Sequence, residues 1–204
     1  MKTALIGASG FIGTRVLAEL STRGHAVTAI TRNPETVAKL PGVAAVAGDI
    51  HKADALAAQL KGHQAVISAV HFLATDLDVL VDGVRQSGVK RWIVVGGAGS
   101  LEIAPGKRLV DAPNFPEAYK AEALKGADFL AKLKTEAGDL DWSFFSPAAL
   151  IQPGERTGKF RLGTDQLLSD AKGESRISAE DYAIALVDEL EKPAHIRRRF
   201  TIAY

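Results

Sequence analysis

Three glycines near the start of the chain, Gly7, Gly10 and Gly13, have the spacing of a turn that binds phosphate. They follow the apolar residues 3–6 and precede residues 16–20, whose apolar positions have the period of a helix. Because glycine has no Cβ, such a turn brings backbone N–H groups and a helix N-terminus close to a pyrophosphate. Small residues at a strand-to-helix turn also serve tight packing, which is the alternative interpretation. The strand before the glycines and the helix after them favour a nucleotide-binding turn.

The rest of the chain alternates predicted strands with predicted helices, and glycine or proline stands at many of the boundaries. Each parallel crossover needs a dozen or more residues, so this alternation predicts an α/β fold with a doubly wound parallel sheet, the Rossmann fold, and by analogy the strand order 3-2-1-4-5. The predicted strands are residues 2–6, 26–31, 43–47, 64–68, 91–95, 142–145 and 199–203. The predicted helices are residues 10–22, 53–60, 76–86 and 117–136, a short helix opened by Asn33-Pro34, and a last helix capped by Ser178, with Asp181 in place of the usual Glu or Gln of a capping box.

Two irregular stretches interrupt the pattern, at residues 96–116 and 147–175. Loops of this length within a compact domain are usually functional. We expect a single NAD(P)-binding domain over residues 1–204, in which residues 147–204 form a small C-terminal region that covers the substrate. Arg156 and Lys159 lie in this region and are expected to face the substrate.

Composition excludes several classes of function. Twenty-five Lys and Arg against 24 Asp and Glu give a net charge of +1, which predicts no nucleic-acid or membrane partner, and Arg197–Arg199 are expected at a solvated strand edge. The absence of cysteine excludes disulfides and thiolate sites, and the five histidines lack the paired spacing of metal ligands. With no signal-peptide pattern and no apolar run of about 20 residues, a cytoplasmic protein is predicted.

Further motifs connect the chain with a known family. The Gly-x-x-Gly-x-x-Gly turn with Phe11-Ile12 inside it, Thr31-Arg32-Asn33-Pro34 and Gly48-Asp49-Ile50 resemble the atypical short-chain dehydrogenase/reductases. Residues 94–100 and 145–148 carry the same resemblance, which runs along the whole chain. It is closest to the NAD(P)H-binding members related to NmrA and to biliverdin/flavin reductase, and it implies a dinucleotide cofactor.

The cofactor is predicted to be NADP(H) rather than NAD(H). About 20 residues beyond the glycines, NAD-binding chains place an Asp or Glu that accepts hydrogen bonds from the ribose. This chain has Thr31-Arg32-Asn33 there, and the Arg32 guanidinium suits a 2′-phosphate. The alternative is that Arg32 is only an exposed charge beside a helix.

The resemblance also implies roles at two other strand ends, and the position of a third strand end in a doubly wound sheet points to ligand binding. Asp49 would hydrogen-bond the adenine amino group, although a turn or helix N-cap is an alternative role. Ser68, Ala69 and Val70 would pass the nicotinamide-side ribose, although Ser68 could equally be a loop residue, and Ser146-Pro147 ends a strand where ligands bind. The predicted cofactor-binding residues are Gly7, Ser9, Gly10, Phe11, Ile12, Gly13, Arg32, Asp49, Ile50, Ser68, Ala69, Val70, Ser146 and Pro147.

The usual proton donor of the superfamily is incomplete. Most short-chain dehydrogenases use Tyr-x-x-x-Lys, in which the lysine lowers the pKa of a tyrosine one helical turn away. Here Tyr119 is followed four residues later by Ala123. The candidate catalytic residues are Tyr119, Ser100 and His71. Ser100 could instead only hydrogen-bond the backbone of its loop, and His71 could be a loop residue without a catalytic role.

The missing pair favours hydride transfer to a flavin, quinone or similar flat acceptor, since such rings take a proton from water or a weak acid. A non-catalytic NADP(H)-sensing regulator of the NmrA type is the main alternative, and an epimerase is a weaker one. The sequence identifies neither the acceptor nor the oligomeric state.

Overall fold

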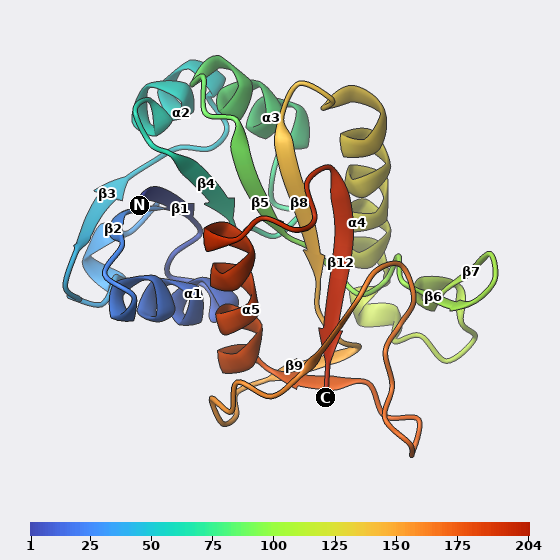
Figure 1. The fold of residues 1–204 in the computed structure, drawn as a ribbon. Helices are drawn as coiled ribbons and strands as arrows, with labels where there is room; N and C mark the ends of the chain where they lie inside the picture. Colours follow the sequence, from blue (N-terminus) through green and yellow to red (C-terminus); the bar gives the residue numbers. More distant parts are fainter.

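A computed structural model describes all 204 residues and contains an eight-stranded sheet in the order β10-β12-β8-β5-β4-β1-β2-β3 (Figure 1). Every neighbouring pair in this sheet is parallel except β10 and β12. The strands are β1 (Lys2–Ile6), β2 (Ala26–Thr31), β3 (Val43–Ala47), β4 (Ala65–Ser68), β5 (Arg91–Val95), β8 (Asp141–Ser146), β10 (Arg161–Gly163) and β12 (Arg198–Ala203). The run β3-β2-β1-β4-β5 confirms the predicted order.

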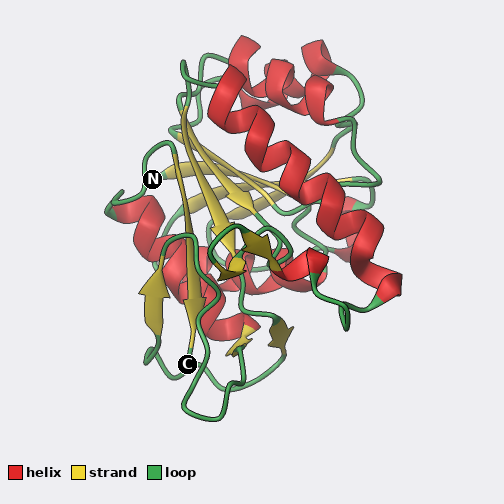
Figure 2. Ribbon diagram, turned by 90° about the vertical axis from the view of Figure 1, so that its right-hand side faces the viewer, coloured by secondary structure: helices red, strands yellow, loops and turns green.

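Helices cover both faces of the sheet, as expected for parallel strands joined by crossovers (Figure 2). Helices α1 (Phe11–Thr22) and α5 (Ala179–Glu191) lie side by side on one face. Helices α2 (Ala53–Leu60), α3 (Leu77–Gln86) and α4 (Glu117–Glu136) pack on the other. A 3-10 helix, η1 (Pro34–Thr36), follows β2. The predicted Rossmann-like α/β fold is confirmed.

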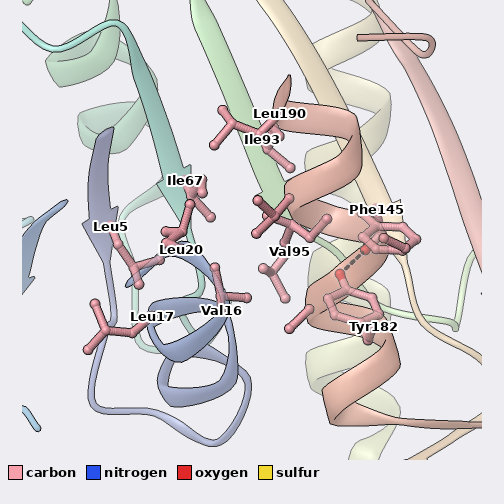
Figure 3. Packing of buried hydrophobic residues seen from close by; sticks show 14 of the residues in the cluster. Leu5, Val16, Leu17, Leu20, Ile67, Ile93, Val95, Phe145, Tyr182 and Leu190 are labelled. Atoms are coloured by element: carbon pink, nitrogen blue, oxygen red, sulfur yellow. Dashed lines mark hydrogen bonds between the residues drawn. The ribbon is translucent and has the colours of Figure 1, made fainter. Parts of the chain in front are cut away.

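The core on the α1 and α5 side shows how the sequence pattern becomes packing (Figure 3). Leu5, Ile67 and Ile93, each from a different strand, are fully buried there. The Tyr182 ring of α5 stacks on Phe145 with centroids 4.1 Å apart, and its hydroxyl donates a 2.6 Å hydrogen bond to the Phe145 carbonyl. Burial raises the pKa of Tyr182 well above its ordinary value, so this hydroxyl remains a structural donor.

The irregular stretches contain short elements that the sequence did not reveal. Residues 96–116 include the hairpin β6 (Glu102–Ala104) and β7 (Lys107–Arg108) and the 3-10 helix η2 (Leu109–Asp111). In the second stretch, β9 (Leu150–Gln152) pairs in parallel with β11 (Arg176–Ser178). The β9–β11 pair connects segments that are distant in the sequence, and β6 and β7 are only two or three residues long, so local periodicity reports neither sheet.

The arginines at 197–199 do not form a solvated sheet edge, so that expectation was wrong for Arg199. Strand β12 lies between β8 and β10, because β10 pairs with its outer side. Arg199 is 5% exposed, and its Nη2 lies 2.6 Å from Asp165 Oδ1.

The last helix has half of the predicted capping box. Ser178 Oγ accepts a 3.0 Å hydrogen bond from Asp181 N, as expected. The Asp181 carboxylate does not return to Ser178 N, which binds the Tyr204 hydroxyl instead. The Asp181 carboxylate instead accepts hydrogen bonds from Thr157 N and Gly158 N, and its side chain is one methylene shorter than that of the usual glutamate. None of the helices combines the length and the apolar character that a membrane-spanning segment requires.

Candidate functional site

A cavity of about 670 Å³ lies at the carboxyl ends of the parallel strands, where ligands bind in open α/β sheets. Its volume is within the range of small-molecule and cofactor sites, roughly 300–1,000 Å³. The loops after β1, β2, β3, β4, β5 and β8 all contribute to its walls, together with the start of α4. One continuous space therefore joins the glycine turn to the loop before α4.

The three glycines of the turn have different physical roles. A Cβ on Gly7, whose φ is +82°, would lie 2.1 Å from the Ala69 carbonyl oxygen, and a Cβ on Gly13 would lie 2.0 Å from the Gly7 carbonyl oxygen. Those two glycines are required by packing of the chain. Gly10 is not, because its φ is −75° and the nearest atom to an added Cβ is 3.4 Å away. Gly10 lines the cavity at the N-terminus of α1, so its missing side chain leaves room for a ligand there.

The end of β2 presents a polar group of side chains to the cavity. Ser9 Oγ and Thr31 Oγ1 are 3.0 Å apart, so the glycine turn and β2 are connected at this point. Arg32 is exposed, lines the same end of the cavity and forms no ion pair. No carboxylate from β2 stands beside it. The geometry therefore suits an anionic group next to Arg32.

The end of β3 places Asp49 and Ile50 in the cavity wall. Asp49 Oδ1 accepts a 3.0 Å hydrogen bond from His51 N, which is a turn interaction. It does not cap α2, because the N-cap residue of that helix is Lys52. Of the two structural alternatives for Asp49, the turn is present, and its other carboxylate oxygen, Oδ2, lies 3.7 Å from Lys52 Nζ in an exposed ion pair.

Three predicted cofactor-binding residues do not reach the cavity. Gly13 is buried in helix packing, and Ser68 Oγ accepts a 3.0 Å hydrogen bond from Trp92 Nε1 within the core. Ser146 is fully buried, and its hydroxyl has no partner. Successive side chains of a strand point to opposite faces, so the last residues of β4 and β8 turn into the helical layer. The residues after them, Ala69-Val70 and Pro147, do line the cavity. The remaining predicted cofactor residues line it as well: Gly7, Ser9, Gly10, Phe11, Ile12, Arg32, Asp49 and Ile50.

Ser100 also lies outside the cavity, which corrects its expected position. Its Oγ accepts a 3.2 Å hydrogen bond from Arg199 Nη1. The tight turn in which Leu101 N donates to the Ala98 carbonyl directs Ser100 toward β12. Arg156, expected to face the substrate, instead donates two hydrogen bonds to the Glu19 carboxylate on α1. Lys159 does not line the cavity either, and of residues 147–204 only 147–151 do.

The other two candidate catalytic residues do face the cavity. Tyr119 is 68% exposed on the first turn of α4, with Ala123 one turn further along the same wall. The His71 side chain is 88% exposed in the loop after β4. The surrounding wall is largely apolar and is formed by Phe72, Leu109, Phe115 and Pro116. We refer to one part of the cavity as the acceptor end. It is lined by His71, Phe72, Thr75, Leu109, Phe115, Pro116, Tyr119, Glu122 and Ala123.

Sequence reasoning missed Glu122. Its carboxylate accepts hydrogen bonds from Phe72 N at 2.7 Å and Leu73 N at 2.9 Å, and its Oε1 lies 3.6 Å from His71 Nδ1. Glu122 thus connects α4 to the loop after β4. Its position three residues after Tyr119 places both on one face of the helix, which was the available signal.

A doubly wound sheet with a glycine turn that leaves room at a helix N-terminus defines a dinucleotide-binding protein of the Rossmann class. Residues 7–193 match the family described as NAD(P)H-binding, and the chain belongs to this family. This confirms the resemblance to the atypical short-chain reductases at the level of the NAD(P)H-binding family. The relation to NmrA stays a prediction.

Solved structures with clear sequence similarity share the whole fold. A candidate exported protein from Burkholderia pseudomallei is 52% identical, covers 100% of both chains and has a TM-score of 0.91. A candidate epimerase from Bacteroides thetaiotaomicron is 43% identical over 100% of this chain and 96% of that chain, with a TM-score of 0.95. A candidate NADH-flavin reductase from Streptococcus pneumoniae is 38% identical over 100% of this chain and 99% of that chain, with a TM-score of 0.84.

Proposed function

We propose that this protein is an NADPH-dependent oxidoreductase that transfers hydride to a flavin, quinone or similar flat acceptor. The observation that carries the proposal is the continuous cavity, which joins a turn suited to pyrophosphate with an apolar acceptor end. A small molecule is the proposed partner, rather than nucleic acid or a membrane surface, because a net charge of +1 provides no general attraction to polyanions.

The residues present fit a dinucleotide. Gly10 leaves space for the pyrophosphate beside the N-terminus of α1, where the helix dipole favours negative charge. Arg32 would bind the 2′-phosphate, and Asp49 would accept a hydrogen bond from the adenine amino group. Ala69, Val70 and Pro147 would border the nicotinamide half. When bound, NADPH supplies the hydride.

The protein's own contribution to the chemistry is chiefly positioning. Phe115 and Leu109, both partly exposed, offer apolar surface against which a ring can pack and from which water is displaced, while the buried Phe72 supports the wall from behind. His71 stands at the solvent boundary of this end and is the proposed proton carrier, since its side chain is 88% exposed and an imidazole nitrogen can pass a proton from water to a bound ring. Tyr119 has no lysine partner and is proposed to contribute little.

The similar proteins support the reaction class but differ in detail. The Streptococcus relative is described as an NADH-flavin reductase, which favours a flavin acceptor, whereas the NADPH preference proposed here depends on Arg32. The epimerase description of the Bacteroides relative is less compatible with this site, because Ala123 replaces the lysine of the usual pair. We propose the cytoplasm as the location, where reduced nicotinamide is supplied, although the Burkholderia relative is described as exported.

The decisive experiment follows the absorbance of NADPH during incubation with flavins, quinones and simple carbonyl compounds. Turnover of at least one flat acceptor, lost in Gly10→Val, is expected. Binding of NADPH and NADP⁺ with unequal affinity and no turnover of any acceptor would instead indicate the sensing regulator. Turnover of carbonyl compounds alone would contradict the proposed acceptor class.

A further inference from the structure

The acceptor end of the cavity contains one charged carboxylate and no lysine or arginine. The cavity's only arginine, Arg32, lies after β2, at the opposite end from α4. The charged side chain at the acceptor end is Glu122, beside His71. Its carboxylate is held in place by Phe72 N and Leu73 N, so it cannot swing away from a ligand as a surface glutamate would.

Lysine and arginine side chains near this end do not compensate for Glu122, and the basic side chain beside it is His71, whose Nδ1 lies 3.6 Å from Glu122 Oε1. Lys120 Nζ is 3.7 Å from Glu117, and Arg108 forms a 2.7 Å ion pair with Asp111. Lys107 and Lys125 have no acidic partner, but neither lines the cavity. A phosphate or sulfonate entering here would meet a negative charge that no lysine or arginine neutralises, at an unfavourable Coulomb energy in partly desolvated surroundings.

From this arrangement we infer that Glu122 is a specificity-determining residue that selects uncharged flat acceptors and discriminates against those that carry a phosphate or sulfonate. The inference rests on the proposed function and refines its substrate class. Riboflavin and FMN are the matched probes, because they share the reacting ring and differ only in the phosphate. A 1,4-naphthoquinone and its sulfonate form a second such pair.

The measured quantity is the ratio of kcat/KM for riboflavin to that for FMN with saturating NADPH, in which any loss common to both acceptors cancels. We expect a ratio above about tenfold, equivalent to about 1.4 kcal/mol, in the unaltered protein. Glu122→Gln should reduce it below about threefold. Glu117→Gln is the matched control, since it removes one negative charge from the same helix, where Glu117 is 89% exposed and outside the cavity.

Salt gives an independent test that does not depend on folding of a variant. The Debye length falls from about 10 Å at 0.1 M to about 3 Å at 1 M salt, so the ratio for the unaltered protein should decrease over this range. A ratio near one in the unaltered protein would overturn the inference. So would a ratio that neither Glu122→Gln nor salt reduces, or one that Glu117→Gln reduces equally.

Equilibrium binding distinguishes failure of the proposed function from failure of the inferred selectivity. Quenching of flavin fluorescence in the presence of NADP⁺ gives dissociation constants for riboflavin and FMN without turnover. If no acceptor is reduced but riboflavin binds at least tenfold more tightly than FMN, the reductase proposal fails and the selectivity of the site stands. If both bind equally or neither binds, the selectivity is refuted as well.

Discussion

Arg199 holds Ser100 away from the cavity: its Nη1 donates a 3.2 Å hydrogen bond to Ser100 Oγ, while its Nε and Nη2 bind Asp165 Oδ1. The guanidinium is almost fully buried, so this arrangement is part of the packing between β12 and the loop after β5. A serine hydroxyl committed to a buried arginine is not available to a substrate. Two candidate proton donors, Tyr119 and His71, therefore remain in the cavity.

Neither the Tyr119 hydroxyl nor the Ser100 hydroxyl is expected to be essential for hydride transfer. Tyr119→Phe should reduce the single-turnover rate by less than about tenfold, since a positioned general acid contributes about 10²-fold or more and Tyr119 lacks its lysine. Ser100→Ala should have a similarly small effect on this rate. It should lower the midpoint of thermal unfolding, because Arg199 Nη1 loses the hydroxyl to which it donates. A decrease of about 10²-fold in the single-turnover rate of Tyr119→Phe would contradict this expectation and favour ordinary carbonyl reduction with Tyr119 as the proton donor.

Gly10→Val should abolish NADPH binding in a folded protein. The valine side chain would occupy the space beside the α1 N-terminus, whereas the chain itself tolerates a Cβ there. Calorimetric titration measures the affinity, and circular dichroism checks the fold. Gly138→Val is the matched control, because nothing lies within 4 Å of a Cβ at Gly138 and this residue is outside the cavity. Unchanged affinity in Gly10→Val would refute the binding role of the turn.

Arg32→Ala should weaken NADPH binding by about 1.5–3 kcal/mol, on the order of 10- to 150-fold, because one charge-assisted phosphate contact is lost. NADH affinity should remain nearly the same, so the ratio of the two dissociation constants narrows. Arg198→Ala removes an exposed arginine outside the cavity and serves as the control. An equal loss for both cofactors would show that Arg32 is structural.

Asp181 is expected to make stability depend on acidity. Burial raises the pKa of this carboxyl, but hydrogen bonds from Thr157, Gly158 and Tyr204 outweigh burial and lower the pKa below its ordinary value of 3.8. Because the folded-state pKa is the lower one, the stabilisation is complete above about pH 4 and is lost as the pH falls through the folded-state value.

Asp181→Asn tests this at two pH values. The free energy of unfolding in urea near pH 7 should be about 1–3 kcal/mol lower for the variant, because the asparagine has one acceptor oxygen instead of two and at least one group that donates to the buried Asp181 loses its acceptor. The difference between the two proteins should shrink as the pH is lowered below about 4. A difference that stays constant down to about pH 2 would assign the effect to packing instead of charge.

Local sequence patterns predicted the elements whose signals are local. Three elements have the predicted bounds: the strands Lys2–Ile6 and Arg91–Val95 and the helix Glu117–Glu136. Their signals are the spacing of their own apolar residues and the glycines or prolines within a few residues of their ends. Strand β10 and the β9–β11 pair were missed, since a three-residue strand has no period to detect and its partner is distant.

For the site as well, positions set by the local chain were predicted, whereas side-chain directions set by distant residues were not. Backbone positions such as Gly10 and Val70 were predicted to lie in the site and line the cavity, because the carboxyl ends of parallel strands converge. The side chains of Ser68 and Ser100 were misplaced, since their direction depends on Trp92 and Arg199, which belong to other elements. Glu122 was overlooked because its partners are backbone N–H groups across the fold.

The interior position of β12 has a consequence for synthesis of the protein. Strand β8 is made well before β12, and β10, although made earlier than β12, pairs in the sheet only with β12. Until β12 is added, the growing chain presents the open edge of β8, whose Trp142, Phe144 and Phe145 are apolar. Such an edge is a template for pairing with another chain, so the interval before β12 emerges is when a nascent copy is most exposed to aggregation and to chaperones.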